Sequence, residues 1–301
     1  MGLTTMPKIP ITVLVTGSTG QLGQSIQYIQ HQYPLLKFTF VSSNELDLSN
    51  ESAVEIFFNK NTFQAIINCA AYTAVDKAES DSLLANKINH LAVKKLVGIS
   101  KQQNAIFIHL STDYVFNGKN YKPYIETDTT DPQGVYGESK LNGELAFEDV
   151  GTQGCIIRTS WVYSEYSNNF VKTMQRLGSE KESLNIIYDQ IGSPTYAGDL
   201  ANAILVIVQS ENLRNGVLKP QVYHYSNEGV CSWYDFAKTI FEFSDIDCKV
   251  IPIETKDYPT PAKRPHYSLL NKSKIKHHFE LEIPYWKDSL QKCIKRLQGQ
   301  I

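Results

Sequence analysis

Short apolar runs alternate with longer amphipathic stretches through the first half of the chain. The short runs are rich in valine, isoleucine and phenylalanine, which is typical of buried strands. They lie at 11–15, 37–41, 65–68, 106–110 and 155–158. The stretches between them repeat apolar residues at helical spacing, and they lie at 21–32, 50–60, 81–103 and 136–148. Strands that alternate with helices over short connections predict an α/β fold with a doubly wound parallel sheet of the Rossmann type.

The alternation becomes less regular after about residue 161. Helical patterns recur near 169–177, 198–209, 232–243 and 284–297. Short strand patterns lie near 183–188, 222–225 and 249–252, and the proline-rich stretch 258–265 is expected to be irregular. We therefore expect a first domain over 1–165 and mainly a smaller C-terminal α/β lobe over 166–301, with parts of 189–229 returning to the first domain. Such a lobe would cover the carboxyl ends of the strands, where α/β proteins bind ligands.

The composition is that of an ordinary globular protein. The 301 residues are 42% hydrophobic and carry a formal net charge of −2, so no basic surplus indicates a nucleic-acid partner. The five cysteines show no CxxC spacing, which fits reduced thiols better than a disulfide framework or a zinc site. No apolar run approaches the length of a membrane span, so we expect no membrane association and a cytoplasmic location.

A glycine-rich turn follows the first predicted strand. Gly17, Gly20 and Gly23 are spaced three residues apart at the start of the first predicted helix. In such a turn the free backbone N–H groups and the helix dipole point at one spot and can bind a pyrophosphate. Gly17 would allow the turn, Gly20 would admit the phosphates, and Gly23 would let helix and strand pack closely. The spacing differs from GxGxxG and a plain turn is the alternative, but the pattern predicts a dinucleotide-binding domain over 1–165.

The segment after the second strand bears on the choice of cofactor. NAD sites usually have an acidic residue there, and an arginine accommodates the 2′-phosphate of NADP. This chain has Ser42, Ser43 and Asn44 instead. Because hydroxyls can bind a 2′-phosphate or tolerate its absence, the cofactor stays open between NADPH and NADH, with NADPH slightly favoured. Asp47 and Leu48 follow, where Asp47 would meet the adenine amino group or serve as a surface turn residue.

A tyrosine and a lysine stand four residues apart where a helix begins after the fourth strand. Tyr136 and Lys140 would lie on one face of that helix. An ammonium beside a phenol favours the phenolate and lowers the phenol pKa from about 10 towards neutrality, which suits a general acid. The same spacing occurs at 33–37, between elements, and at 234–238, on a late helix. Only the pair at 136 and 140 follows the sheet edge at which the glycine turn opens.

Polar and aromatic residues lie at the ends of the fourth and fifth strands. A hydroxyl of Ser111 or Thr112 would orient a substrate carbonyl, and Asp113 would bind substrate hydroxyls, although such residues also form turns. Trp161 would stack on a sugar or base, or belong to the core. His109 lies within the fourth strand and is interpreted as a core histidine.

Metal and nucleophile chemistry find less support. His277 and His278 are adjacent, so a helix or strand would splay them apart, and no HxxxH spacing or carboxylate partner accompanies them. No GxSxG elbow is present. We therefore predict no metal site and no serine hydrolase.

Several motifs together resemble those of the dTDP-4-dehydrorhamnose reductases, a family of extended short-chain dehydrogenase/reductases. The motifs are TGSTGQLG (16–23), AAYTAVDKAE (70–79), STDYVF (111–116), YGESK (136–140), RTSWVY (158–163), DQIGSPT (189–195), SWYDFA (232–237) and RP (264–265). The resemblance spans nearly the whole chain, and the combined set is far more specific than any single motif.

The resemblance implies reduction of the C4 ketone of dTDP-4-dehydro-L-rhamnose to dTDP-L-rhamnose, in nucleotide-sugar biosynthesis for cell-wall polysaccharide. By family analogy, Tyr136 protonates the C4 oxygen, Lys140 lowers the phenol pKa and holds the nicotinamide ribose, and Thr112 hydrogen-bonds the reacting oxygen. Thr112, Asp113 and Trp161 match positions that contact the sugar. The matching cofactor positions are Gly20, Gln21, Leu22, Asp47, Leu48, Ala71, Tyr72 and Thr73.

The chain departs from the family at several positions. Some members form dimers bridged by magnesium through glutamates, and two of those positions here are Ser25 and Gly198. This argues against magnesium and against that dimer, and we expect a monomer or a homodimer. Tyr72 also stands where the family often has histidine.

Two other functions remain open at this stage. One is another extended short-chain dehydrogenase/reductase acting on a nucleotide sugar, such as an epimerase or a dehydratase. A dehydratase would need a pair of carboxylates beside Tyr136, whereas Asp113 is the only acidic residue that directly follows Thr112. The other is a non-catalytic nucleotide-binding regulatory subunit. The β subunit of methionine adenosyltransferase is an example of such a subunit that resembles this family. The joint presence of Thr112, Tyr136 and Lys140 disfavours a silent subunit.

Overall fold

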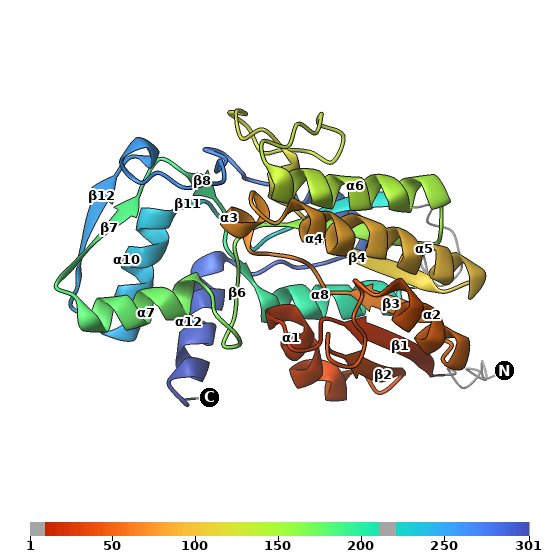
Figure 1. Ribbon diagram of the computed structural model, residues 1–301. Coiled ribbons are helices and arrows are strands. Elements are labelled where there is room, and N and C mark those ends of the chain that lie inside the picture. The colour runs from red at the N-terminus through yellow and green to blue at the C-terminus, as the bar shows by residue number, and fades with distance from the viewer. Residues whose placement is uncertain (1–9, 211–220, 301) are drawn as a thin grey trace.

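The computed structural model describes residues 10–210 and 221–300. Figure 1 shows a layered sheet with helices on both of its faces, and a smaller lobe of helices and short strands at one end of that sheet. The first strand runs from the N-terminal end of the molecule toward the lobe, so the carboxyl ends of the parallel strands face the lobe (Figure 1).

Six parallel strands form the central sheet in the order β2-β1-β3-β4-β5-β10. They are β1 Ile11–Thr16, β2 Leu36–Val41, β3 Ala65–Asn68, β4 Ile106–Thr112, β5 Gly154–Thr159 and β10 Gln221–Tyr225. The order reverses beside β1, because β2 pairs on one side of it and β3 on the other. Doubly wound sheets bind ligands beyond such a reversal, at the carboxyl ends of the strands. The predicted Rossmann-type sheet is confirmed.

Helices cover the two faces of the sheet. One face packs on α1 and α8 through a core that includes Val13 and Val15, and the other packs on α2, α5 and α6 through a core that includes Leu14. Successive residues of β1 therefore enter opposite cores, which explains its continuous apolar run. The helices are α1 Gln21–Ile29, α2 Glu51–Lys60, α5 Ala92–Gln102, α6 Val135–Val150 and α8 Ala197–Gln209.

The lobe has a core of its own, in which Phe236 and Trp286 are buried. Its parallel strand pair is β7 Ser183–Ile187 with β12 Lys249–Ile253, and its helices are α7 Phe170–Glu180, α10 Trp233–Ser244 and α12 Trp286–Leu297. Two pairs of two-residue strands are β6 Val162–Tyr163 with β9 Thr195–Tyr196, and β8 Ile191–Gly192 with β11 Cys231–Ser232. The second half of the chain also supplies α8 and β10 to the sheet layer.

The structure differs from the predicted elements in two helices. The single helix predicted over 81–103 consists of α4 (Ser82–Asn86), a π-helical segment (Lys87–Leu91) and α5. A π-helical turn adds a residue without changing the apolar character of the stretch, so apolar spacing did not reveal it. Helix α11 (Ser273–Phe279), which packs on β10, was not predicted, because it is short and buries only Ile275 and Phe279.

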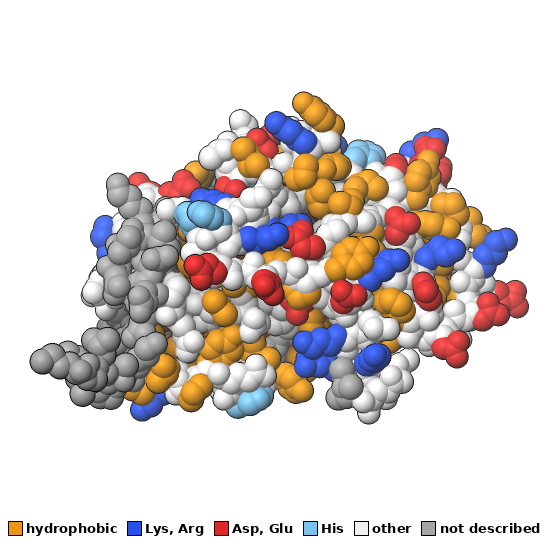
Figure 2. Space-filling model, turned by 180° about the vertical axis from the view of Figure 1, so that it is seen from behind, with side chains coloured by type: hydrophobic (Ala, Val, Ile, Leu, Met, Phe, Trp, Pro, Cys, Tyr) orange, Lys and Arg blue, Asp and Glu red, His pale blue; other side chains and the backbone are white. Residues whose placement is uncertain are grey.

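The surface of the molecule agrees with its small net charge. Figure 2 shows acidic and basic side chains interspersed over the face seen from behind. Within 10–210 and 221–300, no helix is both long and apolar enough to cross a lipid bilayer. All five cysteines are free thiols, and four of them are buried.

Candidate active site

The turn between β1 and α1 requires glycine at two of its three glycine positions. Gly17 has a φ of +66°, and a Cβ there would lie 2.7 Å from the backbone nitrogen of Ala70. A Cβ on Gly23 would lie 2.5 Å from the carbonyl oxygen of Gly17, so helix and strand meet at backbone contact. Gly20 is exposed at the N-cap of α1, where the first N–H groups of the helix lack intrahelical partners. This cradle fits a pyrophosphate.

A cavity of about 460 Å³ opens at this turn and reaches the start of α6. Most of the residues predicted to bind a cofactor line it: Gly17, Gly20, Gln21, Leu22, Asp47, Leu48, Ala71, Thr73, Tyr136 and Lys140. Two do not. Gly23 packs under the turn, and Tyr72 directs its hydroxyl to Oδ2 of Asp81, 3.1 Å away. The cavity thus joins the glycine cradle to the tyrosine–lysine pair.

The segment after β2 forms the far end of this cavity. Ser43 and Asp47 line it. The N–H and hydroxyl of Ser42 both donate to the carboxylate of Glu45, at 2.8 and 2.9 Å, so an acidic group does lie at the end of β2. Oδ1 of Asp47 accepts the N–H of Ser49 at 2.8 Å, which is the turn predicted as one of its two roles.

Tyr136 and Lys140 lie on the first two turns of α6. The Nζ of Lys140 donates to the carbonyl oxygen of Leu110 at 2.5 Å and lies 3.4 Å from Nε2 of His109. Burial lowers the pKa of Lys140 to about 8, and the carboxylate of Glu144 counteracts part of that effect. Both contacts of the ammonium therefore tie α6 to β4.

The phenol of Tyr136 differs from the expectation drawn from spacing. Burial raises its pKa above the usual value of 10.0, and the hydroxyl of Thr112 counteracts this in part. The ammonium of Lys140 is directed to Leu110 and His109. The phenol consequently stays protonated at neutral pH, which is the form that a general acid requires.

The residues at the ends of β4 and β5 lie on the lobe side of the tyrosine. Thr112 donates its hydroxyl to Oδ1 of Asp113 at 3.0 Å and accepts the N–H of Tyr114, whose ring meets that of Tyr136 edge-on. Trp161 has a φ of +49° and stacks on Trp233 with ring centroids 3.7 Å apart. The structure therefore brings Thr112 and Asp113 to the phenol, while Trp161 packs against the lobe; none of these three lines the cavity of the glycine turn.

Asp113 carries an unsatisfied oxygen. Its side chain is buried, and within 10–210 and 221–300 its Oδ2 has no hydrogen-bond partner. Burial raises the pKa of Asp113 from 3.8 to about 6, while the hydroxyl of Thr112 counteracts this in part. A buried carboxylate oxygen without a partner is a group that a sugar hydroxyl can satisfy.

The charge of Asp113 is expected to destabilise the folded protein above pH 6. The folded form binds its proton more tightly than the unfolded form, so stability falls as pH rises between 3.8 and about 6. Relative to Asp113→Asn, the wild-type free energy of unfolding should therefore drop by about 2 kcal/mol between pH 4.5 and pH 8. Urea unfolding at both pH values measures this difference. Asp149→Asn, on the exposed face of α6, is the control, and an equal response of both variants would contradict the expectation.

Asn89 is a buried residue near the site that sequence reasoning missed. It lies in the π-helical segment, accepts the N–H of Tyr72 at 2.9 Å and donates to the hydroxyl of Ser139 at 3.1 Å. It thereby ties the loop after β3 to α6, one residue before Lys140. π-Helical turns often occur at functional sites, but their sequences carry no spacing signal that would have found this residue.

A buried ion pair joins helix α6, which carries Tyr136 and Lys140, to strand β5. Arg158 on β5 and Glu144 on α6 are 4% and 1% exposed, and their Nη2 and Oε2 atoms are 2.6 Å apart. Ser111 lines the cavity of the glycine turn, and its hydroxyl donates to the same carboxylate. An arginine inside an apolar strand was the available sequence signal, because buried charges require partners.

A larger cavity of about 910 Å³ lies in the lobe and includes Phe170, Trp233 and Arg264 in its lining. Nη2 of Arg264 pairs with Oδ2 of Asp76 at 2.5 Å, and Nη1 donates to the hydroxyl of Tyr114 at 3.0 Å. The ring of Tyr114 meets that of Tyr136 edge-on, 5.5 Å between centroids. The lobe cavity is therefore connected to Tyr136 through the side chains of Arg264 and Tyr114.

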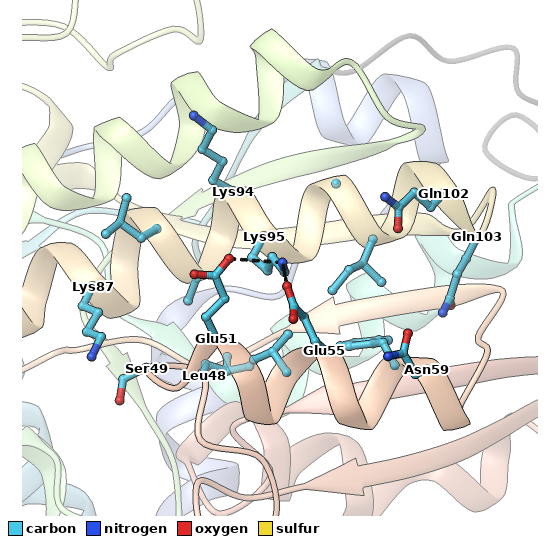
Figure 3. A pocket seen from close by; sticks show the side chains of 16 residues that line it. Leu48, Ser49, Glu51, Glu55, Asn59, Lys87, Lys94, Lys95, Gln102 and Gln103 are labelled. Carbon is cyan, nitrogen blue, oxygen red and sulfur yellow. Dashed lines mark hydrogen bonds and ion pairs between the residues drawn. The ribbon is translucent and has the colours of Figure 1, made fainter.

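A third cavity of about 640 Å³ lies between α2 and α5 and is shown in Figure 3. Lys95 crosses it and donates to the carboxylates of Glu51 and Glu55, at 3.1 and 2.5 Å (Figure 3). It shares Leu48 and Ser49 with the cavity of the glycine turn, but its lining includes neither the turn nor α6. We assign the candidate active site to the cavity of the glycine turn.

Comparisons with known proteins agree with this geometry. Residues 11–299 match the family described as RmlD substrate binding domain. A dTDP-4-dehydrorhamnose reductase of Aggregatibacter actinomycetemcomitans is 38% identical over 289 residues, covering 93% of this chain and 97% of that protein.

Two solved structures are also similar. A dTDP-4-dehydrorhamnose reductase from Clostridium acetobutylicum has a TM-score of 0.89 at 39% identity, covering 96% of this chain and 100% of that one. A dTDP-4-dehydrorhamnose reductase from Bacillus anthracis, solved in complex with NADP, has a TM-score of 0.88 at 35% identity, with the same coverage of 96% and 100%. The resemblance found in the sequence is confirmed by these matches.

Proposed function

The chain belongs to the dTDP-4-dehydrorhamnose reductase family, and on that premise we propose that it reduces the C4 ketone of dTDP-4-dehydro-L-rhamnose to dTDP-L-rhamnose. NADPH or NADH supplies the reducing equivalents, and the reaction belongs to nucleotide-sugar biosynthesis in the cytoplasm. One observation carries the proposal: a single cavity joins the glycine cradle to Tyr136 and Lys140, and Thr112 lies beside the phenol.

The residues around the cavity fit a dinucleotide. The positions at which a Cβ would strike backbone, Gly17 and Gly23, leave the N-terminus of α1 open to a pyrophosphate. Asp47 and Leu48 line the end of the cavity where adenine would lie. A bound reduced nicotinamide would supply hydride to the ketone carbon. The NADP complex of the Bacillus anthracis relative supports NADPH as one of the two cofactors.

The side chains around the phenol suit ketone reduction. Tyr136 donates its phenolic proton to the C4 oxygen as negative charge develops there, because burial keeps the phenol protonated. Thr112 hydrogen-bonds the same oxygen and so orients the carbonyl. Lys140 keeps its positive charge below about pH 8 and holds the nicotinamide ribose with a donor that Leu110 and His109 leave free.

The remainder of the substrate is proposed to extend into the lobe. Asp113 offers its unpartnered oxygen to a sugar hydroxyl. The lobe cavity presents the ring of Trp233 for stacking on a base, and the guanidinium of Arg264 for a diphosphate. Trp161 stacks on Trp233 and so lies next to a residue that lines the lobe cavity.

Magnesium and oligomeric state are not needed for this assignment. The hydroxyl of Ser25 donates to the carbonyl oxygen of Gln21 at 2.9 Å, and a Cβ on Gly198 would lie 2.6 Å from the ring of Tyr196. Of the residues described, no group of three His, Cys, Asp or Glu side chains is placed to hold a metal ion. We propose a monomer or homodimer without a bridging metal.

The decisive experiment is a cofactor-oxidation assay with dTDP- and UDP-linked 4-ketosugars and both nicotinamides. We expect NADPH or NADH to be consumed in a one-to-one ratio with dTDP-L-rhamnose formed. An epimerase or dehydratase would convert sugar without net cofactor oxidation, and a regulatory subunit would bind cofactor without turnover. Either of these results would overturn the proposed function.

A further inference from the structure

Three polar side chains lie next to one another across the central sheet, below the candidate active site. Thr16 on β1 is the register partner of Asn68 on β3, which is the register partner of His109 on β4. Residues two positions apart on a strand share a face. The residues two positions earlier on the same strands are buried in one apolar core: Leu14, Ile66 and Phe107. The sheet therefore changes from an apolar row to a polar row at the last residues of β1 and β3.

The polar row is connected and ends at Lys140. Oγ1 of Thr16 lies 2.7 Å from Oδ1 of Asn68, Nδ2 of Asn68 lies 3.2 Å from Nδ1 of His109, and Nε2 of His109 lies 3.4 Å from Nζ of Lys140. The four side chains are at most 1% exposed. Beyond His109 the next register partner is the apolar Ile156 on β5, so the row turns from the sheet to α6.

Such a row is costly unless its groups are paired. Burying a polar side chain costs free energy, whereas valine or leucine at these positions would continue the core. The pairing is complete only if Lys140 provides a partner for His109. The contact with Lys140 therefore completes the pairing of the row. Packing alone does not explain why polar side chains stand at these three positions.

The charges around Lys140 determine how His109 bonds it. Glu144 faces Lys140 from the next turn of α6 and is itself held by Arg158, while β4 presents the carbonyl of Leu110 and the ring of His109. Burial and the charge of Lys140 hold the pKa of His109 well below its usual value, so the ring is neutral.

A neutral imidazole has one donor nitrogen and one acceptor nitrogen. An ammonium can only donate, so Nε2 of His109 accepts from Lys140 and the ring proton is on Nδ1, toward Asn68. A half turn of the Asn68 amide presents its oxygen to that proton. The hydroxyl of Thr16 both donates and accepts, so it bonds the amide in either orientation.

We propose that Thr16, Asn68 and His109 are positioning residues for Lys140: the row holds the ring of His109 in place, and Nε2 of that ring holds the ammonium beneath the cavity. The inference rests on the role of Lys140 in the proposed function. The contacts, however, exist in the protein without ligand, so they can be tested without turnover.

The test is a matched pair of substitutions at His109. The amide oxygen of His109→Gln can occupy the place of Nε2 and accept from Lys140, whereas the shorter side chain of His109→Asn reaches only the Asn68 side. Both variants lose the stacking of the ring on Phe107, whose centroid lies 6.1 Å from that of His109. Both variants therefore lose the aromatic stacking, and they differ in whether the side chain reaches Lys140.

The first readout is the titration of Lys140 in the ligand-free protein. The ¹³Cε resonance of labelled lysine is followed against pH, and its assignment comes from the signal lost in Lys140→Met. We expect His109→Gln to titrate near the wild-type midpoint and His109→Asn about one pH unit lower, because its ammonium lacks an acceptor. The second readout is the pH profile of kcat/KM, in which His109→Asn should fall about tenfold below His109→Gln at pH 7.5.

The far end of the row provides a second pair. Thr16→Val keeps the shape of the side chain but removes the hydroxyl, while Thr16→Ser keeps the hydroxyl. We expect Thr16→Val to lower the titration midpoint of Lys140, as His109→Asn does. We expect Thr16→Ser to keep the wild-type midpoint. This pair decides the matter if thermal melting shows that His109→Asn does not fold.

Two outcomes separate this inference from the proposed function. Equal Lys140 midpoints and equal activities in His109→Gln and His109→Asn would overturn the inference and leave His109 a space-filling residue. If the variants show the expected Lys140 midpoints but the wild-type protein reduces no 4-ketosugar, the inference on the polar row stands and the proposed function is overturned.

Discussion

Replacing Tyr136 by phenylalanine is expected to lower kcat by ~10²-fold or more, because the variant loses its general acid and keeps the ring. The phenol lines the cavity and is the group that we assign as proton donor to the substrate oxygen. The ring itself still packs edge-on against Tyr114, 5.5 Å between centroids, so the fold should be unaffected. Steady-state kinetics with the 4-ketosugar measures the loss, and fluorescence titration should show a nearly unchanged dissociation constant for the cofactor.

The control for this variant is Tyr234→Phe. Tyr234 also precedes a lysine by four residues on a helix, but it lies on α10, half-buried against the lobe core. Its loss should leave kcat within about twofold, as expected for a residue outside the chemistry. Near-normal activity in Tyr136→Phe would show that another group protonates the substrate.

Replacing Glu144 by glutamine is expected to lower the free energy of unfolding by about 3–5 kcal/mol, since it leaves the charge of Arg158 buried without a counter-charge. Three contacts of 2.6–3.1 Å join the guanidinium to the carboxylate, and both residues are nearly inaccessible. Urea unfolding measures the change. The double variant Glu144→Leu, Arg158→Met should recover much of the loss, because it removes both charges together.

The exposed pair Arg176–Glu180 is the matched control. It has the same chemistry, with a 3.1 Å contact, but both side chains are more than half exposed to solvent. Glu180→Gln should change the unfolding free energy by less than about 1 kcal/mol. A loss in Glu144→Gln as small as in the control would mean that water or another group reaches Arg158.

The elements that sequence predicted well share a strong local signal. The runs that became β1, β3 and β5 are apolar on both faces, and the glycine turn can be recognised because Gly17 and Gly23 tolerate no other side chain. The spacing of Tyr136 and Lys140 was also visible, since both lie on one regular helix. In each case the residues that determine the local structure are close together in the sequence, so the pattern can be seen without the fold.

The features that sequence did not predict depend on contacts between distant elements. The π-helical segment with Asn89 has no spacing signature, and the ion pair of Arg158 with Glu144 forms only when β5 and α6 meet. The interpretation of His109 as a core residue was incomplete for the same reason. The ring is fully buried, but sheet register and α6 together bring it to Asn68 and Lys140.

The return of the chain to the sheet, through α8 and β10, has a consequence for how this protein can be divided. A fragment ending near residue 165 would leave the edge of β5 without its neighbour and the α1 face without its second helix. Unpaired strand edges and uncovered apolar surface promote aggregation. The nucleotide-binding half therefore cannot be expected to persist as an autonomous fragment, and gene truncations or fusions should keep residues up to the end of β10 with it.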